Sequence, residues 1–121
     1  LEPGQTRLGW CTVSLVSLTG NGFGKGSRAL LAATGFSHNG GAKFMHLHDS
    51  RWAARDADFG FSKYMVEGVR ARIVLPGEGI RCRALGENGD VLREVPTRMQ
   101  DGSTVIEIGP EYRTVWYEIS S

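Results

Sequence analysis

The chain has 121 residues and a formal net charge of +1. A chain of this length folds as one domain, and a charge so close to zero argues against nucleic acid or an anionic membrane as the main partner. No apolar run approaches the ~18 residues that a membrane-spanning helix needs. The 17 glycines, about twice the average frequency, indicate many turns and therefore many short strands.

The N-terminal residues carry no secretion signal, and the chain opens with Leu1 rather than Met. We expect a module taken from a longer, secreted protein, so the missing signal says nothing about the export of its parent. Residues 1–121 are expected to form a single sandwich domain, in which residues 1–9 serve as a linker or tail.

The first half of the chain predicts two strands and a long irregular stretch. Residues 10–18 alternate as a strand does, and the glycine-rich loop at 19–27 lacks the spacing of a phosphate-binding loop. Residues 28–36 are apolar, and Gly35 favours a buried strand there over a short helix. Residues 38–64 follow without clear periodicity, and loops of that length are often functional.

Residues 65–75 show the clearest alternation, and a turn at 76–79 leads into a further strand at 80–85. We expect these two runs to form a hairpin, because the turn then sets Leu75 against Ile80 and Ile73 against Cys82 on one apolar face. The same register would set Arg72 against Arg83 on the outer face.

Turn signals at residues 88–89 and 101–102 separate strands predicted at 91–97 and 104–108. Pro110 ends the ladder before the last strand, because proline cannot donate to it. Seven or eight short strands without a convincing helix predict an antiparallel β-sandwich of the jelly-roll or Greek-key type.

The last strand places an aromatic side chain on the face opposite the core. Val115, Tyr117 and Ile119 share one face, and Trp116 and Glu118 share the other. A rigid aromatic plate beside a charged group suits a sugar ring, whose C–H face stacks while its hydroxyls seek polar partners. The alternative is that Trp116 faces a second sheet or lies under a loop.

A second candidate site falls within residues 44–64, where aromatic side chains mix with hydrogen-bonding groups as a polysaccharide site requires. The alternative is that some of these aromatics, Phe59 and Phe61 in particular, pin the loop to the sandwich. The candidate carbohydrate-binding residues of the whole chain are Trp52, Trp116, Trp10, Phe44, His46, His48, Asp49, Arg51 and Tyr64.

Metal binding has weaker support. Gly40 followed by His46 and His48 resembles the first motif of the cupins, but the glutamate that should come next is missing, and so is the third histidine of the second motif. Asp56 and Asp58 suit a structural calcium site, although two carboxylates supply too few of the oxygens that calcium takes. We therefore expect no cofactor, and a structural calcium ion is the alternative.

The remaining polar residues suggest no catalytic centre. Glu107 and Glu118 lie on predicted strands, but a small sandwich offers no deep cleft between paired carboxylates. Cys11 and Cys82 are expected as free thiols rather than a disulfide, because a core of this size needs no covalent link. The arginine pairs 70/72 and 81/83 suggest either a basic stripe for an acidic polysaccharide or, as we favour, a solvated face balanced by glutamates.

Residues 91–96 and 106–119 resemble the end of the β-sandwich modules that follow catalytic domains in bacterial glycoside hydrolases, and residues 65–69 and 84–89 fit the same pattern. In such modules a Trp-Gly pair often precedes the strand at 65–69, whereas Phe59-Gly60 stands here. The chain is similar in particular to the carbohydrate-binding modules of family 5 endoglucanases. The resemblance implies a non-catalytic β-glucan binder.

The leading hypothesis is thus a module that binds plant cell-wall β-glucan, such as soluble β-glucan, xyloglucan or cellulose, and keeps an attached glycoside hydrolase on its polymer. The expected partners are the polysaccharide and the catalytic domain of the same parent chain, with no nucleic acid and no membrane. The alternatives are a structural sandwich that buttresses a catalytic domain and a cupin-like metal enzyme that uses His46 and His48.

Overall fold

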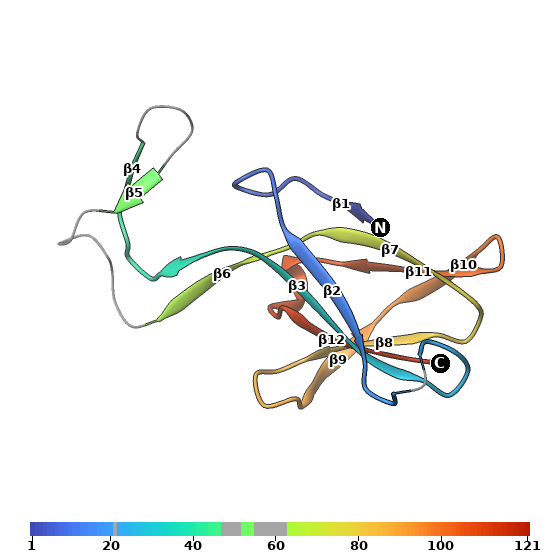
Figure 1. Ribbon diagram of the computed structural model, residues 1–121. Helices are drawn as coiled ribbons and strands as arrows, with labels where there is room; N and C mark the ends of the chain where they lie inside the picture. The colour runs from blue at the N-terminus through green and yellow to red at the C-terminus, as the bar shows by residue number, and fades with distance from the viewer. Residues whose placement is uncertain (21, 47–51, 55–62) are drawn as a thin grey trace.

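The computed structural model describes residues 1–20, 22–46, 52–54 and 63–121, with the backbone alone for residues 46 and 52–54. Two antiparallel sheets pack face to face as a sandwich (Figure 1), which confirms the predicted fold class. The four-stranded sheet has the spatial order β1 (Glu2–Pro3), β7 (Ala71–Pro76), β11 (Ser103–Ile108) and β10 (Thr97–Gln100).

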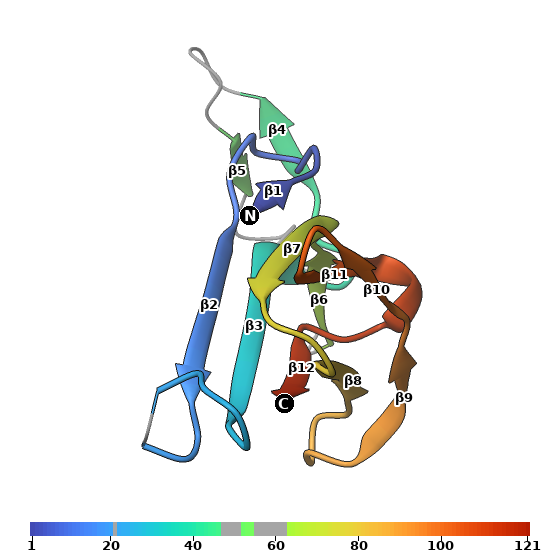
Figure 2. The same ribbon diagram turned by 90° about the vertical axis from the view of Figure 1, so that its right-hand side faces the viewer.

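The six-stranded sheet is longer at one end. Its main path is β2 (Thr12–Ser17), β3 (Arg28–Asn39), β12 (Trp116–Ser120), β8 (Arg81–Leu85) and β9 (Val91–Val95). A sixth strand, β6 (Tyr64–Gly68), pairs with the second half of β3, and together they extend away from β8 and β9 (Figure 1). A separate ladder of β4 (Phe44–His46) and β5 (Trp52–Ala54) lies at the end of this extension (Figures 1 and 2).

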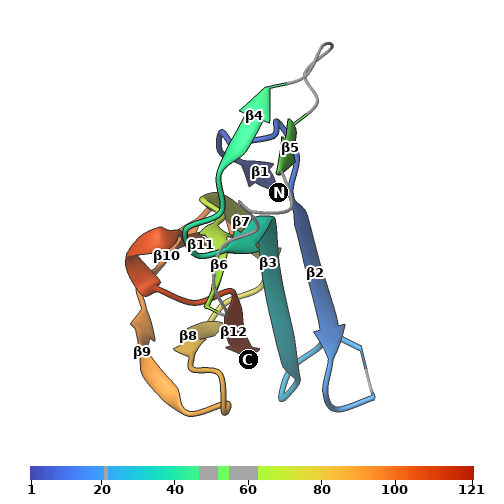
Figure 3. The same ribbon diagram turned by 90° about the vertical axis from the view of Figure 1, so that its left-hand side faces the viewer.

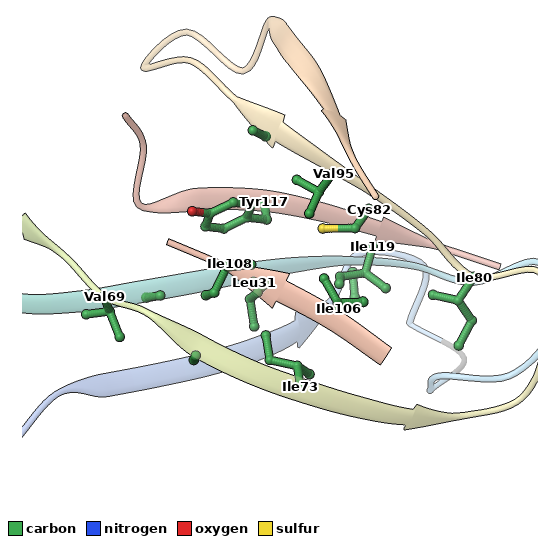
Figure 4. Close-up of a cluster of buried hydrophobic side chains, with 14 residues drawn as sticks. Leu31, Val69, Ile73, Ile80, Cys82, Val95, Ile106, Ile108, Tyr117 and Ile119 are labelled. Carbon is green, nitrogen blue, oxygen red and sulfur yellow. The ribbon is translucent and has the colours of Figure 1, made fainter. Parts of the chain in front are cut away.

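The core lies between the two sheets and is built from the alternate side chains of both. The four-stranded sheet contributes Ile73, Ile106 and Ile108, and the six-stranded sheet contributes Leu31 and Tyr117 among others (Figure 4). Tyr117 is 1% exposed, and its hydroxyl lies 3.4 Å from the carbonyl oxygen of Gly109. The strand alternation that predicted a buried Tyr117 is therefore confirmed.

The expected hairpin at residues 65–85 is wrong, because the turn at 76–79 carries the chain from one sheet to the other. Ile73 on β7 pairs with Ile106 on β11, whereas Cys82 on β8 pairs with Ile119 on β12. Both arrangements bury the same alternate residues. Two paired strands bury the side chains of the face they share, and two strands in facing sheets bury the side chains that point towards the opposite sheet.

Two predicted strands divide for the same reason. The run at 65–75 becomes β6 in the six-stranded sheet and β7 in the four-stranded sheet, with the exchange between Gly68 and Ala71. The run at 91–97 divides at Pro96 into β9 and β10, again in different sheets. A continuous alternating pattern marks the inward side chains without marking the point at which a strand changes sheet.

The structure also describes the predicted turns, the N-terminal residues and the connection before the last strand. The turn glycines Gly89 and Gly102 have φ angles of 81° and 72°, the left-handed region that such hairpin turns require. Residues 1–9, expected as a linker or tail, include β1, which pairs with β7. A 3-10 turn at Pro110–Tyr112 links β11 to β12. Within the described ranges, no helix has the length and apolarity to cross a bilayer.

Candidate functional site

Trp116 lies on the outer face of the six-stranded sheet at the start of β12. Its indole is 39% exposed, and alternation along β12 places it opposite the core side chain of Tyr117. The residue directly across on β3 is Ala32, and the next one across on β2 is Ser14. Because both neighbours are small, the indole stands above its surroundings on that side, and among the described strands none forms a second layer over it.

The backbone that carries Trp116 is held by the residue two positions earlier. The hydroxyl of Thr114 accepts a hydrogen bond from the Trp116 amide at 3.0 Å and donates to the Leu85 carbonyl at 2.5 Å. These two bonds tie the start of β12 to β8, so the aromatic plate rests on a fixed piece of backbone. A pre-positioned plate loses little entropy when a ligand stacks on it.

Glu118, two residues further along β12, is the most unusual polar residue of this face. It is only 6% exposed although its side chain points outward. Its Oε1 atom accepts hydrogen bonds from Arg28 Nε and from Arg83 Nη2, each at 2.9 Å. The hydrogen bond from Arg28 lowers the pKa of the Glu118 carboxyl, and the charge of Arg83 adds to this effect while burial opposes it.

The cluster of Arg28, Arg83 and Glu118 carries a net positive charge. Arg81 Nη2 donates to Glu94 Oε1 at 2.7 Å, so that pair is neutral. Arg28 and Arg83 share the single charge of Glu118, which leaves one unit of positive charge.

Aliphatic side chains extend the same face towards the edge strand β2. Val16 is 58% exposed, and it lies directly opposite the half-buried Leu30, which in turn lies opposite Glu118. Trp10, just before β2, is 57% exposed. The face therefore combines one fixed aromatic plate with aliphatic surface and arginine donors.

The predicted loop residue Phe44 lies in a packed aromatic cluster. Its ring meets those of Phe36 and His38 edge to face, at centroid distances of 5.5 and 5.6 Å. The guanidinium of Arg7 lies 4.7 Å above the Phe36 ring. Phe44 is thus half-buried. This position agrees with the alternative expectation, in which some of the aromatic residues pin this segment to the sandwich.

The same region is tied down by Glu67 on β6. Its Oε1 atom accepts from the Arg7 amide at 2.7 Å, and its Oε2 atom accepts from the Phe36 amide at 3.0 Å. A Cβ atom at Gly35 would lie 2.6 Å from Oε2, so a larger residue here would displace this carboxylate. One carboxylate thereby joins the N-terminal segment, β3 and β6, a link that the sequence pattern did not indicate.

Of the other predicted residues of the second site, only Tyr64 has a described side chain. Tyr64 opens β6 and is 79% exposed. The β4–β5 ladder sets the backbone of His46 opposite that of Trp52, and their side chains lie outside the description. His48, Asp49 and Arg51 lie outside the described residues, as do Asp56, Asp58, Phe59 and Phe61.

The structure thus separates the predicted site residues into two regions. Trp116 belongs to the body of the sandwich, and Phe44 belongs to the ladder at the far end of the β3–β6 extension (Figures 1 and 3). Sequence reasoning missed Arg28 as a partner of Glu118, because the two residues meet only through the β3–β12 pairing. The position of Glu118, two residues after Trp116, was the one local signal.

The predicted basic stripe is wrong in its geometry, and each of its arginines has a glutamate partner, although Arg83 shares Glu118 with Arg28. Arg72 lies on the four-stranded sheet and Arg83 on the six-stranded sheet. Each of the four arginines has a glutamate within 4 Å: Arg70 with Glu111, Arg72 with Glu2, Arg81 with Glu94 and Arg83 with Glu118.

The four-stranded sheet carries a shallow polar groove rather than a plate. Two adjoining hollows of about 240 and 350 Å³ share Glu107 and Glu111 in their walls. Arg98 pairs with Glu107 at 2.7 Å, and Arg70 pairs with Glu111 at 3.5 Å. Because these charged side chains are paired with each other, the groove offers a ligand fewer free hydrogen-bonding groups than the Trp116 face does.

Within the described ranges, neither the two cysteines nor the residues of metal-binding types form a reactive arrangement. Cys11 and Cys82 are free, as expected, and burial raises the pKa of the Cys82 thiol to about 12. Such a thiol stays protonated at neutral pH and is a poor nucleophile. The described residues contain no group of three or more His, Cys, Asp or Glu placed to hold a metal ion.

Comparison with family models, curated proteins and solved structures finds no match to this chain. What the geometry establishes is an all-β domain of two antiparallel sheets packed as a sandwich, with Trp116 and an arginine–glutamate cluster on its six-stranded outer face.

Proposed function

We propose that this domain is a non-catalytic polysaccharide-binding module that holds β-glucan chains on the outer face of its six-stranded sheet. The observation that carries the proposal is the exposed Trp116 on the outer face of the sheet, two residues along β12 from the Glu118 carboxylate that Arg28 and Arg83 share. Aromatic plates bury apolar surface at a low entropy cost, because only two side-chain torsions are fixed.

In this account the indole receives the C–H face of one sugar ring. Stacking that removes about 60 Å² of apolar surface from water contributes ~1.5 kcal/mol. In this account the guanidinium groups of Arg28 and Arg83, which both bind Glu118 two residues along β12 from Trp116, donate hydrogen bonds to oxygens of the bound sugar. Val16 and Leu30 supply further apolar surface towards β2.

The gain for the parent enzyme is effective concentration. A binding module on a secreted glycoside hydrolase keeps the catalytic domain close to its polymer, even where each contact is weak. The resemblance to modules of bacterial glycoside hydrolases supports this setting. In this account Tyr64, exposed at the start of β6, lies outside the centre of the site.

A second candidate function is a structural one, in which the same face packs against a neighbouring domain. The exposed aliphatic residues on this side of the sandwich favour it: Val16 is 58% exposed, Leu18 54% and Val91 48%. A dry interface would cover these residues and Trp116 together.

Affinity gel electrophoresis against hydroxyethyl cellulose, xyloglucan, mixed-linkage glucan and a uronate polymer separates the two functions. The binding module is retarded by at least one polymer, and free oligosaccharide of the same kind restores its mobility. A domain whose mobility is the same in every gel is the structural sandwich, and the binding proposal is then wrong.

A further inference from the structure

The arginine–glutamate cluster beside Trp116 is short of negative charge. A guanidinium group has five N–H donors, and Glu118 accepts one hydrogen bond from Arg28 and one from Arg83, both at the same oxygen, Oε1. The structure gives the other N–H groups of these two arginines no protein partner among the described residues. The cluster therefore has donors left for a ligand.

These donors are accessible from solvent. The side chain of Arg28 is 59% exposed and that of Arg83 is 31% exposed, whereas that of Glu118 is only 8% exposed. The carboxylate of Glu118 is therefore less exposed than either guanidinium.

The spacing between the plate and the cluster matches one sugar residue. Trp116 and Glu118 are two residues apart on β12, which separates them by about 6.6 Å along the strand. Arg83 lies directly opposite Glu118 on β8. A pyranose ring stacked on the indole then brings a substituent on its edge within reach of a guanidinium.

We infer that the Trp116 face takes an acidic sugar, with the ring on Trp116 and an anionic substituent on Arg83 and Arg28. Guanidinium groups bind carboxylates in a two-pronged geometry, and such charge-assisted bonds are roughly twice as strong as neutral ones. This inference rests on the proposed function and narrows it from glucans in general to chains that carry uronate groups.

A matched pair of ligands tests it: a β-1,4-linked glucose hexamer and the same hexamer oxidised at C6 to glucuronate. The two ligands differ only in the C6 group. Calorimetric titration of both therefore measures the contribution of the carboxylate alone to the binding free energy. We expect the oxidised hexamer to bind at least tenfold more tightly at low salt. The preference should shrink as salt rises, because both arginines are reached by solvent ions.

Charge-matched variants separate direct contact from the general field of the protein. Arg83→Gln and Arg28→Gln should each reduce the preference for the oxidised hexamer about tenfold. Arg98→Gln removes the same charge from the four-stranded sheet, where Arg98 pairs with Glu107, and should leave the preference within twofold. Glu118→Gln removes the competing carboxylate and should raise the affinity for the oxidised hexamer, an effect opposite to that of a merely weakened fold.

The outcomes are distinct. If both hexamers bind equally, or if Arg98→Gln reduces the preference as much as Arg83→Gln does, the acidic-sugar inference is wrong while the proposed function stands. If neither these hexamers nor any polymer in the gel panel binds, the proposed function fails and the inference fails with it. Circular dichroism melting checks each variant, and the more exposed Arg28 supplies the result should Arg83→Gln unfold.

Discussion

Glu118 and Arg83 lie directly opposite each other on β12 and β8, and Arg83 Nη2 donates to Glu118 Oε1 at 2.9 Å. Cross-strand pairs of opposite charge contribute modestly on an exposed face. Here the carboxylate is nearly buried and also accepts from Arg28, so the three side chains fix one another beside Trp116.

The cluster makes stability depend on pH. Since the arginines lower the folded-state pKa of Glu118 below its ordinary value of 4.5, its stabilising effect is complete above about pH 4.5 and is lost as pH falls through the lower folded value. Urea midpoints measured from pH 7 to pH 3 should fall less steeply for Glu118→Gln than for the natural sequence. Glu87→Gln, in the exposed turn after β8, is the matched control and should leave the slope as it is. Identical slopes for the natural sequence and Glu118→Gln would contradict this role.

Glu67 should hold the N-terminal segment against the β3–β6 extension. Glu67→Ala removes both acceptors of the Arg7 and Phe36 amides, and a net loss of about 1–3 kcal/mol is expected because hydrogen bonds to a charged group are lost. Hydrogen exchange followed by NMR should show faster exchange at both amides, with Glu67→Gln intermediate because one carbonyl oxygen remains. Unchanged protection at Arg7 and Phe36 would show that other contacts hold the segment.

The two thiols should differ sharply in reactivity. Cys82 is fully buried, and burial raises its pKa to about 12, whereas Cys11 is partly exposed. A thiol reagent at pH 8 should therefore modify Cys11 in the native protein and Cys82 only after unfolding. In Cys11→Ser the fast phase should vanish. A fast phase that persists in this variant would place Cys82 at the surface.

The alternation of side chains was predictable from the sequence, because burial follows a period of two in any strand. Tyr117 and Ile119 face the core and Trp116 faces outward, as the pattern of the last strand indicated. Strand pairing was not predictable in the same way. Ile73 and Cys82 are both inward-facing whether they share a hairpin or lie in opposite sheets, so the pattern fits both arrangements equally.

Contacts between distant parts of the chain could not be predicted from the sequence, for a related reason. Arg28 and Glu118 are 90 residues apart and meet because β3 pairs with β12. Arg7 reaches Phe36 because Glu67 binds both amides. No local signal marks either contact, whereas the aromatic residue beside a charge at Trp116 and Glu118 was visible in the strand itself.

The central claim is that Trp116 is the plate on which a sugar ring stacks, and one substitution tests it most directly. In a β-glucan affinity gel, or with a uronate-bearing polymer, Trp116→Ala should weaken retention about tenfold or more, since the stacked area contributes ~1.5 kcal/mol. Phe23→Ala removes an aromatic ring that is 59% exposed in the loop after β2, and it should be retained like the natural sequence. Retention of Trp116→Ala equal to that of the natural sequence, with an unchanged melting temperature, would contradict the account.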